Sequence, residues 1–500
     1  MNDLPTYQFP ARAASGVLFG LSAARLGAVA TAGIVLITTL TRPTTTGVLV
    51  GLLVIGLLLA SASLRVGGRA LIDWLPVCVA FGWQQATRNN EFYASPDLDL
   101  DLPEGTLDLP GELFGIEIHH FTGASRAAIA SPTRAAYGIV RDTFRHRAVA
   151  IAEIAGDDFL FLDPADQQGR VAAWGRVLDH LAQSVPELSR LHVVHNVGPA
   201  STASLVAHQR DHGGRGTDIT AASYERVLDA SGAYSQHHRV LLAIGLDLRA
   251  ARRAIRQAGG GSEGAAQVLM DRAAMVEDTL RSAGLGVQGW LPAATIGAVL
   301  RAAFDPSAAP QLADDATDAP ANDGAGVAPG SAGPTGMIDG WAAVRHDSGW
   351  STTLQITRPP ARPVTAEFLQ HLLIGVPVQR RLSLLYVPTP VATAERRAQT
   401  QQVSTESEQT LRARWGFGTS ARQRRAWQDA AQREEDLVEG RTVYRVVWLL
   451  TVTAATPSLL DTAVSQVEAA ARRCSLELRR LSGTQRQGFA FTLPLCRGAR

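Results

Sequence analysis

Two apolar stretches near the start of the chain dominate the hydrophobic pattern. Residues 16–40 and 47–64 are almost free of charge, and the polar hexapeptide "TRPTTT" separates them. Each stretch is close to the ~20 residues that a helix needs to cross about 30 Å of hydrocarbon. The pattern predicts a transmembrane helical hairpin over residues 1–68.

The hexapeptide predicts where the hairpin turns. Arg42 at the centre of a bilayer would cost about 2.5–3.5 kcal/mol, and Pro43 would interrupt a single helix. Both costs vanish if Arg42, Pro43 and Thr44 form a turn in water. A signal peptide fits poorly, because the apolar region is too long and no A-x-A cleavage site follows it.

Arginine placement predicts the orientation of the hairpin. Arg12, Arg25, Arg65 and Arg69 flank or enter the two apolar stretches, whereas only Arg42 lies between them. Positive residues favour the cytoplasmic side. We therefore expect a two-span protein of the cell membrane with both termini in the cytoplasm.

An amphipathic segment follows the hairpin. Within residues 69–94, the apolar side chains of Leu71, Leu75, Val79 and Trp83 recur at helical spacing. The segment is too short for a third span, so it predicts a helix lying at the cytoplasmic membrane interface.

The rest of the chain alternates strand-like and helix-like runs in two blocks, 95–304 and 341–500, with a charged helical insertion at 391–440. Interleaved strands and helices predict the α+β class, and the repeated β-α-β order favours two ferredoxin-like lobes in the cytosol. Residues 305–340 are rich in Ala, Asp, Pro and Gly, which predicts a disordered linker.

Composition excludes several classes of chemistry. All 47 basic residues are arginine. A chain without lysine has no P-loop lysine, Schiff-base lysine or lysine general base. This usage, together with abundant Ala and Gly, is typical of a GC-rich, actinobacterial genome. The formal net charge of +1 gives no general argument for wrapping nucleic acid.

The sequence predicts no metal, cofactor or catalytic site. The three cysteines are far apart and form no C-x-x-C pair. His208 and His212 have the i, i+4 spacing of a metal motif but lack its glutamate, and the other histidine pairs diverge. We therefore expect a protein that is not an enzyme.

One basic stretch within residues 412–428 contains interleaved tryptophans and could contact nucleic acid, anionic lipid or a protein partner. Acidic residues follow at once, so a solvated helical hairpin is the alternative that we favour. The residues of this candidate contact are Arg412, Arg414, Trp415, Arg422, Arg424, Arg425 and Trp427.

These stretches together resemble a family. "TYQFPARAASGVLFGLSAARLGAVA", "GGRALIDWLPVCVAFGWQ" and "FLFLDPADQQGRVAAWGRVLDHLAQ" look like the PrgI-like two-helix membrane proteins of actinobacterial type IV-like secretion and conjugation loci. The last third, from "GRTVYRVVWLLTVTA" to "GFAFTLPLCRG", is similar to the non-catalytic amino-terminal half of VirB/TraC-type transfer ATPases. The resemblance implies a scaffold in the inner membrane that docks a separate ATPase, other apparatus subunits or copies of itself.

Three alternatives remain open. An EccE-like component of type VII secretion also has two amino-terminal helices and a cytosolic domain. An enzyme acting at the membrane surface would need a pocket with perturbed carboxylates. A protein that contacts DNA within a transfer machine would use the arginines at 412–425.

Overall fold

The computed structural model describes residues 6–7, 9, 23–41, 44–94, 105–122, 136–155, 159–199, 236–312, 326–390 and 441–498, with single residues at 223, 226–227, 393, 396, 428, 431–432 and 435. The chain divides into two units. The hairpin unit comprises Pro10–Asn90 and Ala392–Glu439, and the sheet unit comprises Met1–Phe9, Glu91–Val391 and Gly440–Arg500.

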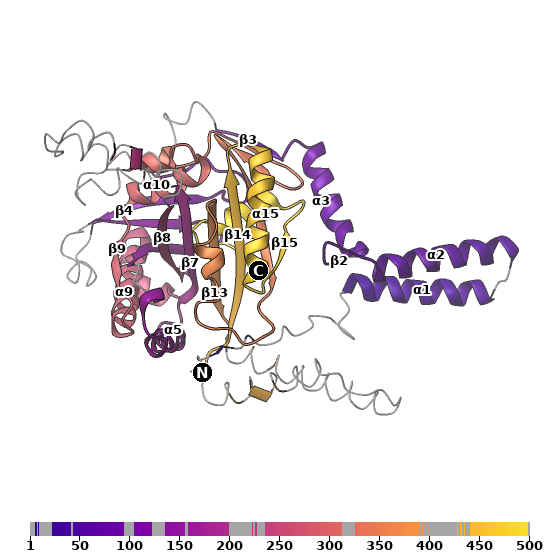
Figure 1. Cartoon of the computed structure of the whole chain (residues 1–500), viewed down its shortest axis with the longest axis horizontal. Coiled ribbons are helices and arrows are strands. Elements are labelled where there is room, and N and C mark those ends of the chain that lie inside the picture. The colour runs from indigo at the N-terminus through magenta and orange to yellow at the C-terminus, as the bar shows by residue number, and fades with distance from the viewer. Residues whose placement is uncertain are drawn as a thin grey trace. The chain divides into compact units, whose positions relative to one another are not determined.

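The hairpin unit contains two long helices followed by a short strand pair and a third helix. Its elements are α1 (Ala23–Thr41), α2 (Thr45–Ser63), β1 (Arg65–Val66), β2 (Arg69–Ala70), η1 (Leu71–Trp74) and α3 (Leu75–Ala86). Helices α1 and α2 lie antiparallel to each other (Figure 1). The two predicted apolar helices are therefore confirmed.

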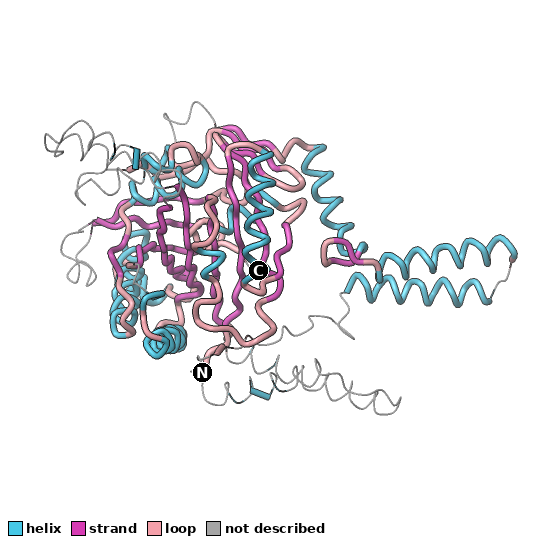
Figure 2. The backbone as a smooth tube through the Cα atoms, in the orientation of Figure 1, coloured by secondary structure: helices cyan, strands magenta, loops and turns pink. Residues whose placement is uncertain are grey.

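The sheet unit is built around one large antiparallel sheet (Figure 2). Its described strands are β3 (Glu91–Tyr93), β4 (Ile116–Thr122), β5 (Ala136–Asp142), β6 (Arg147–Ile154), β7 (Leu188–Pro199), β8 (Gln236–Asp247), β9 (Val287–Trp290), β10 (Gly336–Asp339), β11 (Val344–His346), β12 (Gly349–Arg358), β13 (Gln379–Pro388), β14 (Tyr444–Ala454) and β15 (Glu477–Arg480). Its main path runs β3-β10-β11-β12-β14-β13-β7-β8-β6-β5-β4, with β15 beside β12 and β9 beside β6.

Helices cover both faces of this sheet. They are η2 (Phe159–Phe161), α5 (Pro164–Ser184), α8 (Arg252–Gln257), α9 (Gly261–Ser282), α10 (Ala293–Phe304), η3 (Pro329–Ser331), α12 (Gln370–Leu373), α15 (Pro457–Arg473) and α16 (Gln485–Thr492). Leu384 in β13 and Val193 in β7 lie directly opposite each other. The two hydrophobic clusters to which they belong therefore lie on the same face of the sheet. That face carries α5, α9, α12 and α15, whereas α10 and α16 pack on the other.

The chain repeats one connection pattern twice. The order β4-β5-β6-α5-β7-β8-α9-β9-α10 is followed by β10-β11-β12-α12-β13-β14-α15-β15-α16. The lateral order is β9-β6-β8-β7 in the first half and β15-β12-β14-β13 in the second. The halves meet where residues 191–197 of β7 pair with residues 380–386 of β13. The α+β class is confirmed, but the blocks expected as separate lobes share one sheet.

Two local expectations differ from the structure. The predicted disordered linker at 305–340 is wrong for the described residues 305–312, which form turns and a helical end, and 326–340, which contain η3 and β10. Ala332 and Met337 are buried in residues 326–340 and join the core around α10, so two apolar side chains anchor that part. The sequence of residues 488–495 predicts a strand, yet most of these residues lie in α16. The insertion at 391–440 lies almost entirely outside the described residues.

A buried ion pair holds the segment that follows α16 against the first half of the sheet. The Arg497 Nε donates to Asp142 Oδ2 at 2.9 Å, and both side chains are almost completely buried. The same guanidinium donates to the carbonyl oxygens of Glu112 and Phe114. The buried charge of Arg497 is thus fully engaged.

We predict that Arg497→Ala lowers the free energy of unfolding by about 3–5 kcal/mol, because the buried Asp142 carboxylate loses its closest cationic partner and keeps only Arg145 at 3.5 Å. The matched control is Arg358→Ala, which removes an exposed pair with Glu477 at 2.8 Å and should cost at most about 1 kcal/mol. Urea denaturation followed by near-ultraviolet circular dichroism measures both. Equal losses for the two variants would contradict this role of the buried pair.

Candidate functional site

Helices α1 and α2 have the length and surface of membrane spans. Residues Ala24–Thr41 and Thr45–Ser63 are long and apolar enough to cross a bilayer, and little of either is buried inside the protein. Nineteen helical residues in each helix extend about 28 Å at a rise of ~1.5 Å per residue. Large exposed side chains such as Ile37 and Leu53 would face water if lipid did not cover them.

Small residues let the two spans approach closely. Ala28, Ala32 and Gly51 are buried between the helices. A Cβ atom built on Gly51 would lie 2.3 Å from Oγ1 of Thr39, so no larger residue fits there without movement. The Thr39 hydroxyl donates to the Val35 carbonyl within its own helix. Close packing at small residues is the usual basis of helix association in lipid.

The break between the spans falls where the polar hexapeptide stands. Helix α1 ends at Thr41 and α2 begins at Thr45. The Thr44 hydroxyl accepts a hydrogen bond from the Gly47 amide at 3.1 Å and caps α2. Arg42 and Pro43 lie outside the described residues, so their exposure to water stays a prediction.

Polar contacts tie the base of the hairpin to the segment after it. Arg25 in α1 forms an ion pair of 2.9 Å with Asp73 in η1. Trp74 donates its indole N–H to the Val66 carbonyl, and the Arg69 guanidinium lies 5.5 Å from the centre of the Trp74 ring. Tryptophan and arginine at the end of a span suit the headgroup region, where apolar and polar groups are both solvated.

The amphipathic stripe expected after the hairpin is exposed. Leu71, Leu75, Val79 and Trp83 have between 46% and 70% of their surface accessible. They follow one another at four-residue intervals from η1 into α3 and so lie on one side of the helix. An exposed apolar row of this kind fits the boundary between headgroups and acyl chains.

Buried histidine–serine pairs lie within the sheet unit. His192 Nε2 is 2.7 Å from Ser383 Oγ, and His346 Nε2 is 2.7 Å from Ser351 Oγ. Burial lowers the pKa of His192 to about 3 and that of His346 to about 4, so both rings are neutral at physiological pH. All four side chains are buried. A substrate cannot reach them, so their role is to satisfy polar groups within the core.

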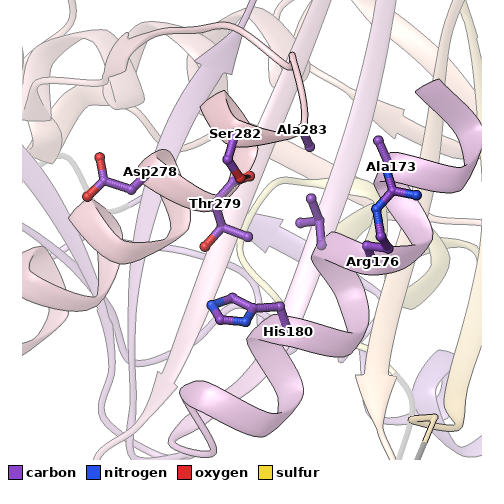
Figure 3. A pocket seen from close by; sticks show the side chains of 8 residues that line it. Ala173, Arg176, His180, Asp278, Thr279, Ser282 and Ala283 are labelled. Atoms are coloured by element: carbon purple, nitrogen blue, oxygen red, sulfur yellow. Dashed lines mark hydrogen bonds between the residues drawn. The ribbon is translucent and has the colours of Figure 1, made fainter. Parts of the chain in front are cut away.

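A shallow depression lies between α5 and α9 (Figure 3). It has a volume of about 440 Å³ and is open to solvent. Arg176 and His180 line it from α5, and Asp278, Thr279 and Ser282 line it from α9. Figure 3 shows these polar side chains spread over two helices rather than converging on one point.

The predicted basic contact lies outside the described residues, so the structure does not place it. Its members are Arg412, Arg414, Trp415, Arg422, Arg424, Arg425 and Trp427. In the part of the chain that is described, no group of three or more His, Cys, Asp or Glu residues has the arrangement of a metal site.

Residues 234–356 match the EccE family model, described as a type VII ESX secretion system translocon. The match covers about a quarter of the chain and contains β8, α8, α9, β9, α10, η3, β10, β11 and most of β12. No curated protein matches the chain. The EccE match and the two apolar helices place the chain in the membrane and link it to protein secretion.

This match corrects the resemblance drawn from the sequence. The assignment to PrgI-like proteins of type IV-like conjugation, with a type IV ATPase as partner, is wrong, because the matched family belongs to type VII secretion. That assignment depended on apolar runs, and any membrane hairpin followed by α+β repeats presents similar ones. The matched segment carries no short motif whose chemistry identifies a secretion system, and the sequence predicted for it only α+β elements and part of the linker at 305–340.

We predict that Gly51→Leu forces α1 and α2 apart, because the added side chain meets Thr39. Gly56→Leu is the matched control, since a Cβ atom at Gly56 has nothing within 4 Å. Pulsed electron resonance between spin labels at positions 29 and 59 measures the separation in detergent or nanodiscs. A longer distance in G51L alone is expected, and unchanged distances in both variants would contradict the packing.

Proposed function

We propose that the chain is a membrane-anchored, non-catalytic component of a type VII ESX secretion translocon. The match of residues 234–356 to EccE is the observation that carries this proposal. Two helices suited to spanning the bilayer support it, because a translocon subunit must be held at the membrane. The alternative of an EccE-like component, left open by the sequence, thus becomes the main interpretation.

The architecture of the sheet unit suits a rigid platform. We propose that each half is a ferredoxin-like repeat, since each combines β-α-β-β-α-β order with antiparallel strands in the lateral order 4-1-3-2. Pairing of β7 with β13 joins the halves through backbone hydrogen bonds. A sheet fixed in this way offers other apparatus subunits a surface of constant shape.

A scaffold rather than an enzyme is favoured by the chemistry of the described residues. The two histidine–serine pairs are buried and neutral. The depression between α5 and α9 is shallow, and its polar side chains are spread apart. We therefore propose that the partners are lipid and other membrane subunits of the translocon, with self-association and the arginines at 412–425 as further sources of contact.

The arginine distribution supports an orientation with both termini in the cytoplasm and the turn at Thr44 outside. The sheet unit would then face the cytoplasm, where substrates enter a secretion channel. Trp74 and the exposed stripe of α3 would lie at the cytoplasmic headgroups.

Loss of the chain should abolish export of small WxG-type substrates from a host that carries the matching type VII locus. The wild-type chain should restore export, whereas a chain lacking residues 23–63 should not, because it is no longer held at the membrane. Immunoblotting of culture filtrates measures export. Normal export together with a lost frequency of plasmid conjugation would overturn the assignment.

Thr44→Cys tests the orientation. A membrane-impermeant maleimide added to intact cells should label T44C, since the turn is expected outside. The wild-type chain is the control, because its exposed Cys78 in α3 should react only after the membrane is opened. Labelling of Cys78 but not of the thiol introduced at position 44 in intact cells would reverse the proposed topology.

A further inference from the structure

Two exposed phenylalanines form a pair at one end of the sheet unit. Phe114 precedes β4 and Phe144 lies in the turn between β5 and β6, and their ring centres are 5.4 Å apart. Phe114 is 59% exposed and Phe144 is 65% exposed. Single exposed apolar residues are ordinary, whereas here two exposed rings pack on each other and form a small apolar patch.

The backbone around the pair holds these rings in place. Gly115 has a φ of +76°, and a Cβ atom there would lie 2.2 Å from the Phe144 ring. The Thr143 amide and hydroxyl both donate to the Gly115 carbonyl at 3.0 Å. The ring of Phe144 therefore lies against a position where only glycine fits, next to a turn fixed by two hydrogen bonds.

A cluster of arginines lies at the same end of the sheet. Arg147 at the start of β6 pairs with Asp247 at the end of β8, so the turn before β6 and the turn after β8 are neighbours. The Leu248 amide donates to the His146 carbonyl at 3.0 Å and joins the two turns. The exposed arginines that follow, in and just before α8, are Arg249, Arg252, Arg253 and Arg256.

One acidic residue, Asp247, lies beside these arginines. Among the residues that the structure describes, none of the four forms an ion pair within 4 Å. Asp247, the nearest carboxylate in sequence, accepts hydrogen bonds from the amides of Arg249 and Ala250. Arg145, beside Phe144, adds a further exposed cation, although it also contacts Asp142 at 3.5 Å. The end of the sheet thus combines a strongly positive surface with two apolar rings.

We infer that this aromatic–basic surface, comprising Phe114, Phe144, Arg145 and the four arginines at 249–256, docks on the anionic headgroups of the bilayer that holds the hairpin. Guanidinium groups bind phosphate oxygens, and phenylalanine rings enter the boundary with the acyl chains. The surface is distinct from the hairpin and from the stripe on α3.

A lipid surface explains the combination better than the other polyanions do. Single-stranded nucleic acid also binds arginine and aromatic rings, but the two spans keep this chain beside lipid at high effective concentration. The inference goes beyond a role in type VII secretion and needs only that the chain is anchored in a membrane. Its failure would therefore leave that role untouched.

The test places a polarity-sensitive fluorophore at Phe144. In a Cys78→Ser background, Phe144→Cys is labelled with nitrobenzoxadiazole, while Cys474 and Cys496 stay buried. The full chain is reconstituted in nanodiscs of phosphatidylcholine alone or with phosphatidylglycerol. We expect a blue shift of emission and quenching by doxyl lipids with phosphatidylglycerol only, both weakened by salt.

Two variants serve as controls. Phe161→Cys carries the label at an exposed aromatic position beyond the other end of β6, and its emission should stay that of a water-exposed probe in both lipids. Replacing Arg249, Arg252, Arg253 and Arg256 with glutamine should remove most of the quenching at position 144 while circular dichroism and the melting temperature stay unchanged.

Several outcomes would overturn the inference. Equal emission in both lipids at position 144, or quenching that survives loss of the four arginines, would show that anionic headgroups are not the ligand. A blue shift produced by single-stranded DNA, with no response to phosphatidylglycerol, would assign the surface to nucleic acid.

Discussion

The pairing of β7 with β13 is the interaction on which the sheet unit depends. Each strand would be an open edge of its own half, with unpaired N–H and C=O groups that invite aggregation. Seven consecutive residue pairs, from Leu191–Tyr386 to Val197–Arg380, close both edges at once. Side chains cross the same seam, because Arg381 donates to Asn196 at 2.8 Å and Ser383 contacts His192.

Helix α16 covers part of this seam, because the Arg381 guanidinium lies 5.7 Å from the centre of the Phe489 ring and Ser383 Oγ donates to the Phe491 carbonyl at 3.4 Å. Phe489 packs at 5.5 Å from Phe304 and at 5.1 Å from His346, so α16 fits against residues that the first half and the start of the second provide. The segment that follows continues into the first half, where Arg147 and Arg190 donate to the Cys496 carbonyl. Burial lowers the pKa of Arg190 to about 10, with repulsion from Arg147 as a second cause. The two halves interlock and are expected to unfold together.

Sequence reasoning predicted the features that repeat with a simple period. The hairpin spans and the stripe of Leu71, Leu75, Val79 and Trp83 follow from apolar spacing alone, and the structure shows both helices and the exposed row. The α+β class followed from alternating runs. Contacts between residues far apart in the chain could not be predicted from these patterns. Residues 488–492 have strand-like spacing but lie in α16, where Gly488 packs closely against Thr353 and Leu481. The segment that contains Ala332 and Met337 has few apolar side chains, which predicted disorder. The core around α10 nevertheless buries both residues.

The candidate site shows why the type of secretion system was harder to predict from the sequence than the location in the membrane. An apolar hairpin must lie in lipid whatever apparatus it serves, so it identifies a location and no partner. The segment that matches EccE carries mostly interior features, such as the Trp290 indole donating to buried Glu277 at 3.0 Å and Arg281 pairing with the same carboxylate at 2.6 Å. Such groups stabilise a fold and do not contact a neighbour. A fold alone does not specify a function. The specificity of a scaffold must therefore reside in exposed positions, where short patterns are hardest to separate from ordinary solvated surface.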